Sequence, residues 1–232
     1  MADSRQNDKQ VGGFTPLFNG RDLSGWVIPD GDNGHWKVVD GVIDYDALSE
    51  ARGDKNLWTE ASFRDFRLHV EWRFKGISGQ YPMPTILPDG SYKTDENGDV
   101  IKVPIPNSDS GIYLRGTSKA QINIWCWTVG SGEIWGFRTD SSMPPEVRAA
   151  CVPKVCADRP VGEWNAFDIT MIADRLTILL NGRVVIDNAQ LPGVPEEGPI
   201  ALQHHGGRNP ETGEMSPASS LIQFRNVRIQ SL

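Results

Sequence analysis

Two short alternating runs between residues 110 and 127 carry side chains that are suited to binding a sugar. Successive side chains of a strand point to opposite faces, so each run has one aliphatic face and one face of mixed character. Amides and a guanidinium can pair with hydroxyl groups, and aromatic rings can stack on the apolar side of a sugar ring. The mixed face carries Tyr113, Arg115, Gln121, Asn123, Trp125 and Trp127, and Trp135 follows in a glycine-containing loop. We therefore expect a carbohydrate-binding face here.

A third run, residues 67–75, also alternates and places His69, Glu71 and Arg73 on its polar side. If this strand neighbours 111–115 in one sheet, Glu71 and Arg73 converge with Arg115. The three side chains would then form either a site with a positioned carboxylate or a plain ladder of ion pairs.

A fourth run, residues 200–205, places Gln203 and His205 on one side. Gly206 and Gly207 follow, and residues without a side chain let other groups approach the backbone closely. A neutral imidazole suits a general base as well as a metal ligand. Both roles stay open for His205. As a metal ligand, it would share a divalent cation with Glu71.

The elements that must position these residues are short strands separated by Gly, Asn and Asp turns. Asn181-Gly182 between two apolar runs is the strongest hairpin signal, and 145–150 favours a short helix. The pattern predicts an all-β, two-sheet antiparallel β-sandwich. Its expected strands are 36–39, 42–45, 56–59, 67–75, 111–115, 121–127, 134–137, 166–173, 175–180, 183–189, 200–205 and 222–232.

With 232 residues, of which 38% are hydrophobic, we expect a single domain over 14–232 after a disordered segment 1–13. The proline-rich stretch 76–107, called the insert below, interrupts the series of strands. It is too long for a hairpin loop, and loops of this length are commonly functional. We expect it to form a flap beside the mixed face.

The net charge of −7 argues against nucleic acid as a partner. No apolar run approaches the roughly 20 residues of a membrane span, and the polar first ten residues do not read as a signal peptide. Cys126 is expected to pack as a small hydrophobe. Cys151 and Cys156 are close enough in sequence to form a disulfide or to stay as two thiols.

These residues together resemble the 3-keto-disaccharide hydrolase domain family. The matching stretches are F-T-P-L-F-N-G-R-D-L-S-G-W (14–26), W-K-V-V-D-G-V-I (36–43), F-R-L-H-V-E-W-R-F (66–74), S-G-I-Y-L-R-G (110–116), G-E-W-N (162–165) and L-Q-x-H-G followed by F-R-N-V-R-I (202–206, 224–229). The resemblance implies a concanavalin A-like or laminin-G-like sandwich of the jelly-roll type. It also implies a bacterial protein of the periplasm or exterior that acts on glycosides oxidised at C3. Gln121, Asn123 and Cys126 depart from the family's Glu-x-Gln-x-x-Asp pattern, and His204 stands where Asp is common.

A 3-keto sugar can lose its C1 substituent by elimination, because the ketone acidifies the proton on C2. This chemistry needs one base and donors for the enolate oxygen, and water can add afterwards. For this chemistry we expect His205 or Glu71 to be the base and Arg115 and Arg73 to stabilise the enolate. The substrate-binding set is then His69, Arg73, Tyr113, Gln121, Asn123, Trp125, Trp127, Trp135 and Gln203. Two alternatives remain, a non-catalytic carbohydrate-binding module and an ordinary glycoside hydrolase that uses Glu71 and Glu133.

Overall fold

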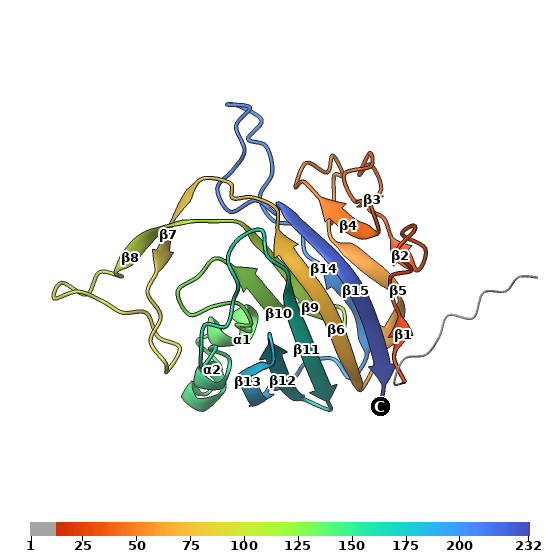
Figure 1. Ribbon diagram of the computed structural model, residues 1–232. Helices are drawn as coiled ribbons and strands as arrows, with labels where there is room; N and C mark the ends of the chain where they lie inside the picture. Colours follow the sequence, from red (N-terminus) through yellow and green to blue (C-terminus); the bar gives the residue numbers. More distant parts are fainter. Residues whose placement is uncertain (1–12) are drawn as a thin grey trace, which may run out of the picture.

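A computed structural model describes residues 13–232, so the expectation of disorder over 1–13 falls, apart from Gly13, outside the described residues. Alternating strands build two antiparallel sheets (Figure 1). The larger sheet has the order β13 (Arg183–Gln190), β12 (Arg175–Leu180), β11 (Asn165–Ile172), β6 (Phe66–Phe74), β15 (Ile222–Ser231), β4 (Val42–Tyr45) and β3 (Lys37–Val39), with β1 (Thr15–Pro16) beside β15. The smaller sheet has the order β10 (Thr117–Trp125), β9 (Asp109–Leu114), β14 (Gly198–Leu202), β5 (Leu57–Phe63) and β2 (Trp26–Val27). The predicted two-sheet antiparallel sandwich is confirmed.

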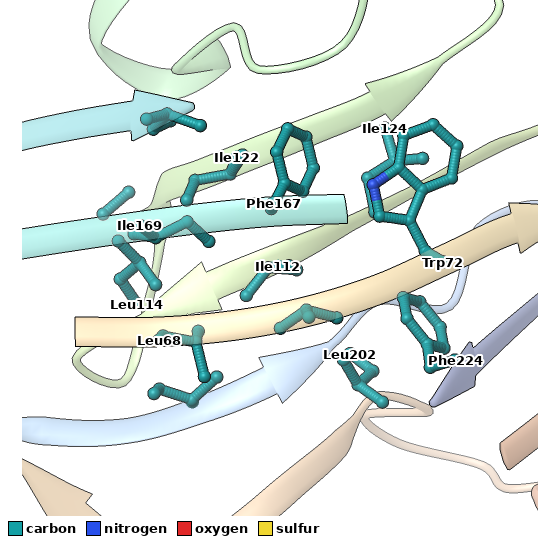
Figure 2. Close-up of a cluster of buried hydrophobic side chains, with 14 of the residues drawn as sticks. Leu68, Trp72, Ile112, Leu114, Ile122, Ile124, Phe167, Ile169, Leu202 and Phe224 are labelled. Carbon is teal, nitrogen blue, oxygen red and sulfur yellow. The ribbon is translucent and has the colours of Figure 1, made fainter. Parts of the chain in front are cut away.

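The core lies between the two sheets, where their aliphatic faces meet. Ile112, Ile122 and Ile124 of the smaller sheet pack toward side chains of the larger sheet, among them Trp72 and Phe167 (Figure 2). Each such side chain stabilises the fold by about 1.5–3 kcal/mol through removal of apolar surface from water. Because one face of each sheet is used in this way, the two remaining faces point away from each other across the core.

The hairpin turns follow the sequence signals closely. Asn181 and Gly182 have φ angles of 52° and 78° and connect β12 to β13. Positive φ at both central residues gives the turn the twist of the flanking strands. The predicted hairpin is confirmed.

Two short helices, α1 (Trp135–Arg138) and α2 (Pro145–Ala150), follow β10. The prediction of a helix at 145–150 is confirmed, but the predicted strand at 134–137 is wrong. Gly136 lies against the backbone of Lys119, where a Cβ would come within 2.4 Å of the Lys119 carbonyl oxygen. The glycine lets one turn of helix pack on β10 in place of another strand. None of the helices in the described part of the chain has the length and apolar character needed to cross a membrane.

The insert forms a two-stranded ribbon of β7 (Gln80–Pro84) and β8 (Lys102–Pro106), which the strand predictions missed. Four of its five prolines lie in this ribbon, which has no third strand, so that a missing N–H donor costs little. Met83 and Ile86 of the insert form a second small cluster with Trp127 and Val152. Figure 1 shows the ribbon standing out from the two sheets on the side of α1 and α2.

Candidate functional site

A pocket of about 820 Å³ lies on the outer face of the smaller sheet, and β9, β10 and the chain after β14 form its floor. The strand register sets the order of the floor residues. Gln121 of β10 pairs with Tyr113 of β9. Four residues further along β10, Trp125 pairs with Asp109. The pocket contains eight of the sequence-predicted residues, Tyr113, Gln121, Asn123, Trp125, Trp127, Trp135, Gln203 and His205. Strand alternation therefore brings together side chains from three separate segments of the chain.

Gly111 lies at the centre of the floor and leaves room for a hydrogen bond above it. The Nε2 of Gln121 donates to the Oε1 of Gln203 over 2.8 Å. A Cβ on Gly111 would lie 2.7 Å from the Gln203 Oε1 and 2.9 Å from the Ile122 carbonyl oxygen. These contacts are too short for any side chain, so the amide pair requires glycine beneath it.

Hydrogen bonds fix the orientation of the floor amides. Both oxygens of Glu133 accept, one from Arg138 and one from the Nδ2 of Asn123 at 3.1 Å. The Oδ1 of Asn123 therefore faces Gln121, whose Nε2 donates to it over 3.0 Å as well as to Gln203. Gln203 is left with its Nε2 as a donor. A buried acid thus determines which atoms of the amides face a ligand.

Glu133 and Arg138 form a buried pair beside the pocket, with the two side chains 0% and 2% exposed. Burial raises the pKa of Glu133, and the charge of Arg138 and its hydrogen bond partly offset that shift. Arg138 also donates to the Gly90 carbonyl and the Tyr92 hydroxyl, both over 3.3 Å. The pair therefore connects the insert to the floor of the pocket.

Tyr113 supplies a phenol at the far end of the floor. Burial raises its pKa to about 12, and a hydrogen bond from Gln203 partly opposes that shift. The hydroxyl therefore stays protonated at neutral pH. Its proton can therefore be donated to a ligand.

Asp109 and His205 form an acid–imidazole pair at the other end of the floor. The Nδ1 of His205 lies 2.8 Å from the Ala218 carbonyl oxygen. A carbonyl only accepts, so Nδ1 carries a proton, and in the neutral form of the ring the lone pair is on Nε2. That Nε2 lies 3.5 Å from the Oδ2 of Asp109. Burial, and then the negative charge of Glu133, raise the pKa of Asp109 well above its usual range. The pair thus places a carboxyl whose proton is favoured by burial beside an imidazole nitrogen that can act as a base.

An aromatic wall closes the pocket beyond Asp109. The ring centroids of Trp125 and Trp127 are 5.5 Å apart, and Tyr81 of the insert lies 6.0 Å from Trp125. Trp127 is only 5% exposed, because Met83 and Ile86 pack against it. Met83 and Pro84 also border the pocket. The insert therefore contributes one wall of the site.

Arg115 lies outside this pocket, and its expected convergence with the other polar side chains is wrong. It follows the last residue of β9 with a φ of 50°, so strand alternation has ended before it. Its guanidinium donates to the carbonyls of Arg64, Ala173 and Pro195 at 2.6–3.1 Å, and to Asp65 at 3.0 Å. The side chain is 1% exposed and holds three turns together.

Glu71, Arg73 and His69 also lie apart from the pocket. Their strand, β6, belongs to the larger sheet between β11 and β15, so its polar side faces away from the smaller sheet. Glu71 accepts from Arg225 and Asn226, both at 2.7 Å. His69 pairs with Asp168, and Arg73 donates to Gln223. The polar side of β6 is therefore a ladder of ion pairs and hydrogen bonds, which is the second of the two alternatives expected for Glu71.

The expected sharing of a divalent cation by Glu71 and His205 is wrong, because the two side chains lie on opposite faces of the sandwich. Among residues 13–232, no group of three or more His, Cys, Asp and Glu side chains is placed to hold a metal ion. The three cysteines are free thiols, with Cys151 buried and Cys156 exposed.

Comparison with known proteins identifies the family. The model of the 3-keto-alpha-glucoside-1,2-lyase-like domain matches residues 13–230. The chain belongs to this family. Membership in the 3-keto-alpha-glucoside-1,2-lyase-like family makes the chain a carbohydrate-active protein.

Two crystal structures from Parabacteroides distasonis, each named "putative glycosyl hydrolase", share the fold of this family member. The first is 24% identical, with a TM-score of 0.61, over 95% of this chain and 84% of that one. The second is 18% identical, with a TM-score of 0.58, over 95% and 94%. No significant match is found among the curated proteins.

Sequence reasoning missed three parts of the site in this 3-keto-alpha-glucoside-1,2-lyase-like domain. Asp109 has the same strand parity as Gly111 and Tyr113, so extending the predicted strand by two residues would have found it. Glu133 was considered only as a catalytic carboxylate, and its buried partner Arg138 has no local signal. Tyr81 reaches the pocket through the fold of the insert, which no local pattern predicts.

Proposed function

We propose that this protein cleaves 3-keto-glycosides by eliminating the C1 substituent. The observation that carries the proposal is the His205–Asp109 pair, with an imidazole lone pair and a buried acid 3.5 Å apart in the pocket. A base and an acid in contact suit a reaction that removes one proton and returns another. The amides beside them suit a sugar ring.

In the first step, the Nε2 of His205 takes the proton from C2 of the sugar. The electrons of that C–H bond form a C2=C3 double bond, and negative charge develops on the C3 oxygen. Gln203, two residues from His205, donates to this oxygen through its Nε2. Tyr113 and Gln121 orient more distant hydroxyls.

In the second step, the C3=O bond forms again and the electrons of C2=C3 move to make C1=C2. The C1–O bond breaks, and the departing oxygen takes the proton of Asp109. The products are a 1,2-unsaturated 3-keto sugar and the free aglycone. Passage of the proton from Nε2 of His205 to the Asp109 carboxylate restores both groups, and addition of water to the alkene gives the hydrolysed sugar.

An ordinary two-carboxylate hydrolase is disfavoured by the placement of its acids. Glu71 lies on the larger sheet, and both oxygens of the buried Glu133 accept hydrogen bonds, one from Arg138 and one from Asn123. Asp109 is the buried carboxyl that borders the pocket with a neighbouring base. One acid and one imidazole fit elimination better than hydrolysis between two carboxyls.

The test compares a 3-keto glucoside with its unoxidised parent under identical conditions. Aglycone release from the 3-keto compound alone is expected, and a His205→Ala variant should lose it by at least a hundredfold. A matched His35→Gln variant, which alters a histidine bound to Asp46 elsewhere, should keep it. Release from the parent compound contradicts the proposal. Binding of both compounds without release identifies a carbohydrate-binding module instead.

A further inference from the structure

The aromatic wall lies next to the group that protonates the leaving oxygen. Trp125 is the register partner of Asp109, and Tyr81 and Met83 of the insert extend the wall beyond it. The amides lie in the opposite direction along β9 and β10. A sugar held over the amides therefore directs its C1 substituent toward the wall.

The wall offers few polar atoms to a ligand. The Nε1 of Trp127 donates to the Pro84 carbonyl over 3.2 Å. The Nε1 of Trp125 is buried from solvent and makes no hydrogen bond among the described residues, so it does not face the pocket. Met83 and Pro84 add apolar surface. The Tyr81 hydroxyl is the polar group beside Trp125, and the Arg138–Tyr92 pair lies beside Trp127.

We propose that this wall is an aglycone subsite selective for aromatic groups, and that the insert completes it. The inference rests on the proposed function and deepens it by naming the substrate class, 3-keto-glycosides of aryl or arylalkyl alcohols. A flat ring can pack against Trp125 and Tyr81 in the offset or tilted geometry that aromatic pairs prefer. A second sugar would bring several hydroxyls to the ring faces of Trp125 and Tyr81, which offer fewer hydrogen-bond partners than the amides of the floor.

The size of the pocket agrees with this substrate class. A volume of about 820 Å³ exceeds what one sugar ring fills and lies in the range of sites that bind a drug-sized molecule. Tyr81 is partly exposed, so its ring is available to a ligand. Arg138 donates to Gly90 and Tyr92 of the insert, and these two contacts anchor the segment that carries Tyr81 and Met83.

The experiment compares benzyl and methyl 3-keto-glucosides, which release alcohols of similar leaving ability, together with a 3-keto disaccharide. We expect kcat/KM for the benzyl compound to exceed that for the methyl compound by about tenfold, the size of an aromatic contact. Tyr81→Ala should reduce this ratio to near one. Trp164→Ala, an indole on the larger sheet between Arg73 and Arg225, should keep it. Preference for the disaccharide, or equal rates for all three, overturns the proposal.

A binding measurement separates failure of the subsite from failure of the proposed function. Calorimetry with unoxidised benzyl and methyl glucosides needs no turnover and should show the same tenfold preference and the same loss in Tyr81→Ala. Benzyl preference in binding without cleavage of any 3-keto compound supports the subsite and removes the proposed function. Cleavage of all three compounds without benzyl preference in either measurement leaves the function and removes the subsite.

Discussion

At the scale of single residues, the site depends on the protonation of two neighbours. The Ala218 carbonyl holds the His205 proton on Nδ1, and burial holds the Asp109 proton on its carboxyl. Neither control comes from the residue type alone, because an exposed aspartate would be ionised at neutral pH. The same pair can therefore remove a proton from carbon and supply one to oxygen.

Asp109→Asn should separate acid catalysis from base catalysis. Turnover of a benzyl 3-keto-glucoside, whose alcohol leaves poorly without a proton, should fall by about a hundredfold or more. Turnover of a 4-nitrophenyl 3-keto-glucoside should fall much less, because nitrophenolate leaves unassisted. Equal losses for the two substrates would show that Asp109 does not donate the proton.

The pH profile provides a second readout for Asp109. The acid works only when protonated, and its raised pKa extends that form to higher pH than an ordinary aspartate allows. Turnover of the benzyl compound should therefore fall as pH rises through this pKa. The Asp109→Asn variant should lack this decrease in turnover at alkaline pH.

At the scale of elements, three segments form one floor because strand register aligns them. The alternation of side chains predicted the polar members on β9 and β10 and the inward aliphatic residues, since both follow from a period of two. It could not predict which strands are neighbours. Glu71 was therefore placed on the correct side of its strand and assigned to the wrong sheet.

Arg115 shows the second limit of the same reasoning. Its position two residues after Tyr113 predicts the same face, but the chain turns at Arg115 with a positive φ. Alternation applies only while the strand continues, and a strand end is the least certain feature of a sequence-based prediction. The amide orientations set by Glu133 and Arg138 depend on tertiary contacts and had no local signal.

Gly111→Ala should disrupt the floor without altering any polar group. The new Cβ would lie 2.7 Å from the Gln203 Oε1 and 2.9 Å from the Ile122 carbonyl oxygen, so the Gln203 side chain would have to move. We expect KM to rise about tenfold or more through loss of the oriented amides, and the free energy of unfolding to fall by about 1–3 kcal/mol. Gly53→Ala is the matched control, because nothing lies within 4 Å of its Cβ position. An unchanged KM in Gly111→Ala would remove the amide pair from substrate binding.

At the scale of the whole molecule, the sandwich separates a binding face from a structural one. The core between the sheets keeps the His69–Asp168 and Glu71–Arg225 pairs away from the pocket. The insert adds to the binding face a wall that the sheets do not supply. Arg115 connects the turns at one end of the sandwich through its four partners.

Arg115→Met should lower stability much more than catalysis. Removal of the guanidinium leaves the carbonyls of Arg64, Ala173 and Pro195 without their donor, and Asp65 without its cation. We expect the free energy of unfolding to fall by about 3 kcal/mol in urea titration. Arg67→Met, at an exposed position on β6, should change it by less than about 0.5 kcal/mol. If the folded variant loses turnover at unchanged stability, Arg115 takes part in the reaction after all.

Removal of the proton from C2 of a 3-keto sugar by a base in the pocket is the step on which the proposed function depends. A 3-keto-glucoside carrying deuterium at C2 tests it directly, with the sugar product followed by NMR and mass spectrometry. We expect the product to lose the deuterium to solvent, and His205→Ala to stop both this loss and aglycone release. A sugar product that retains the deuterium at C2 after the aglycone has left would contradict it.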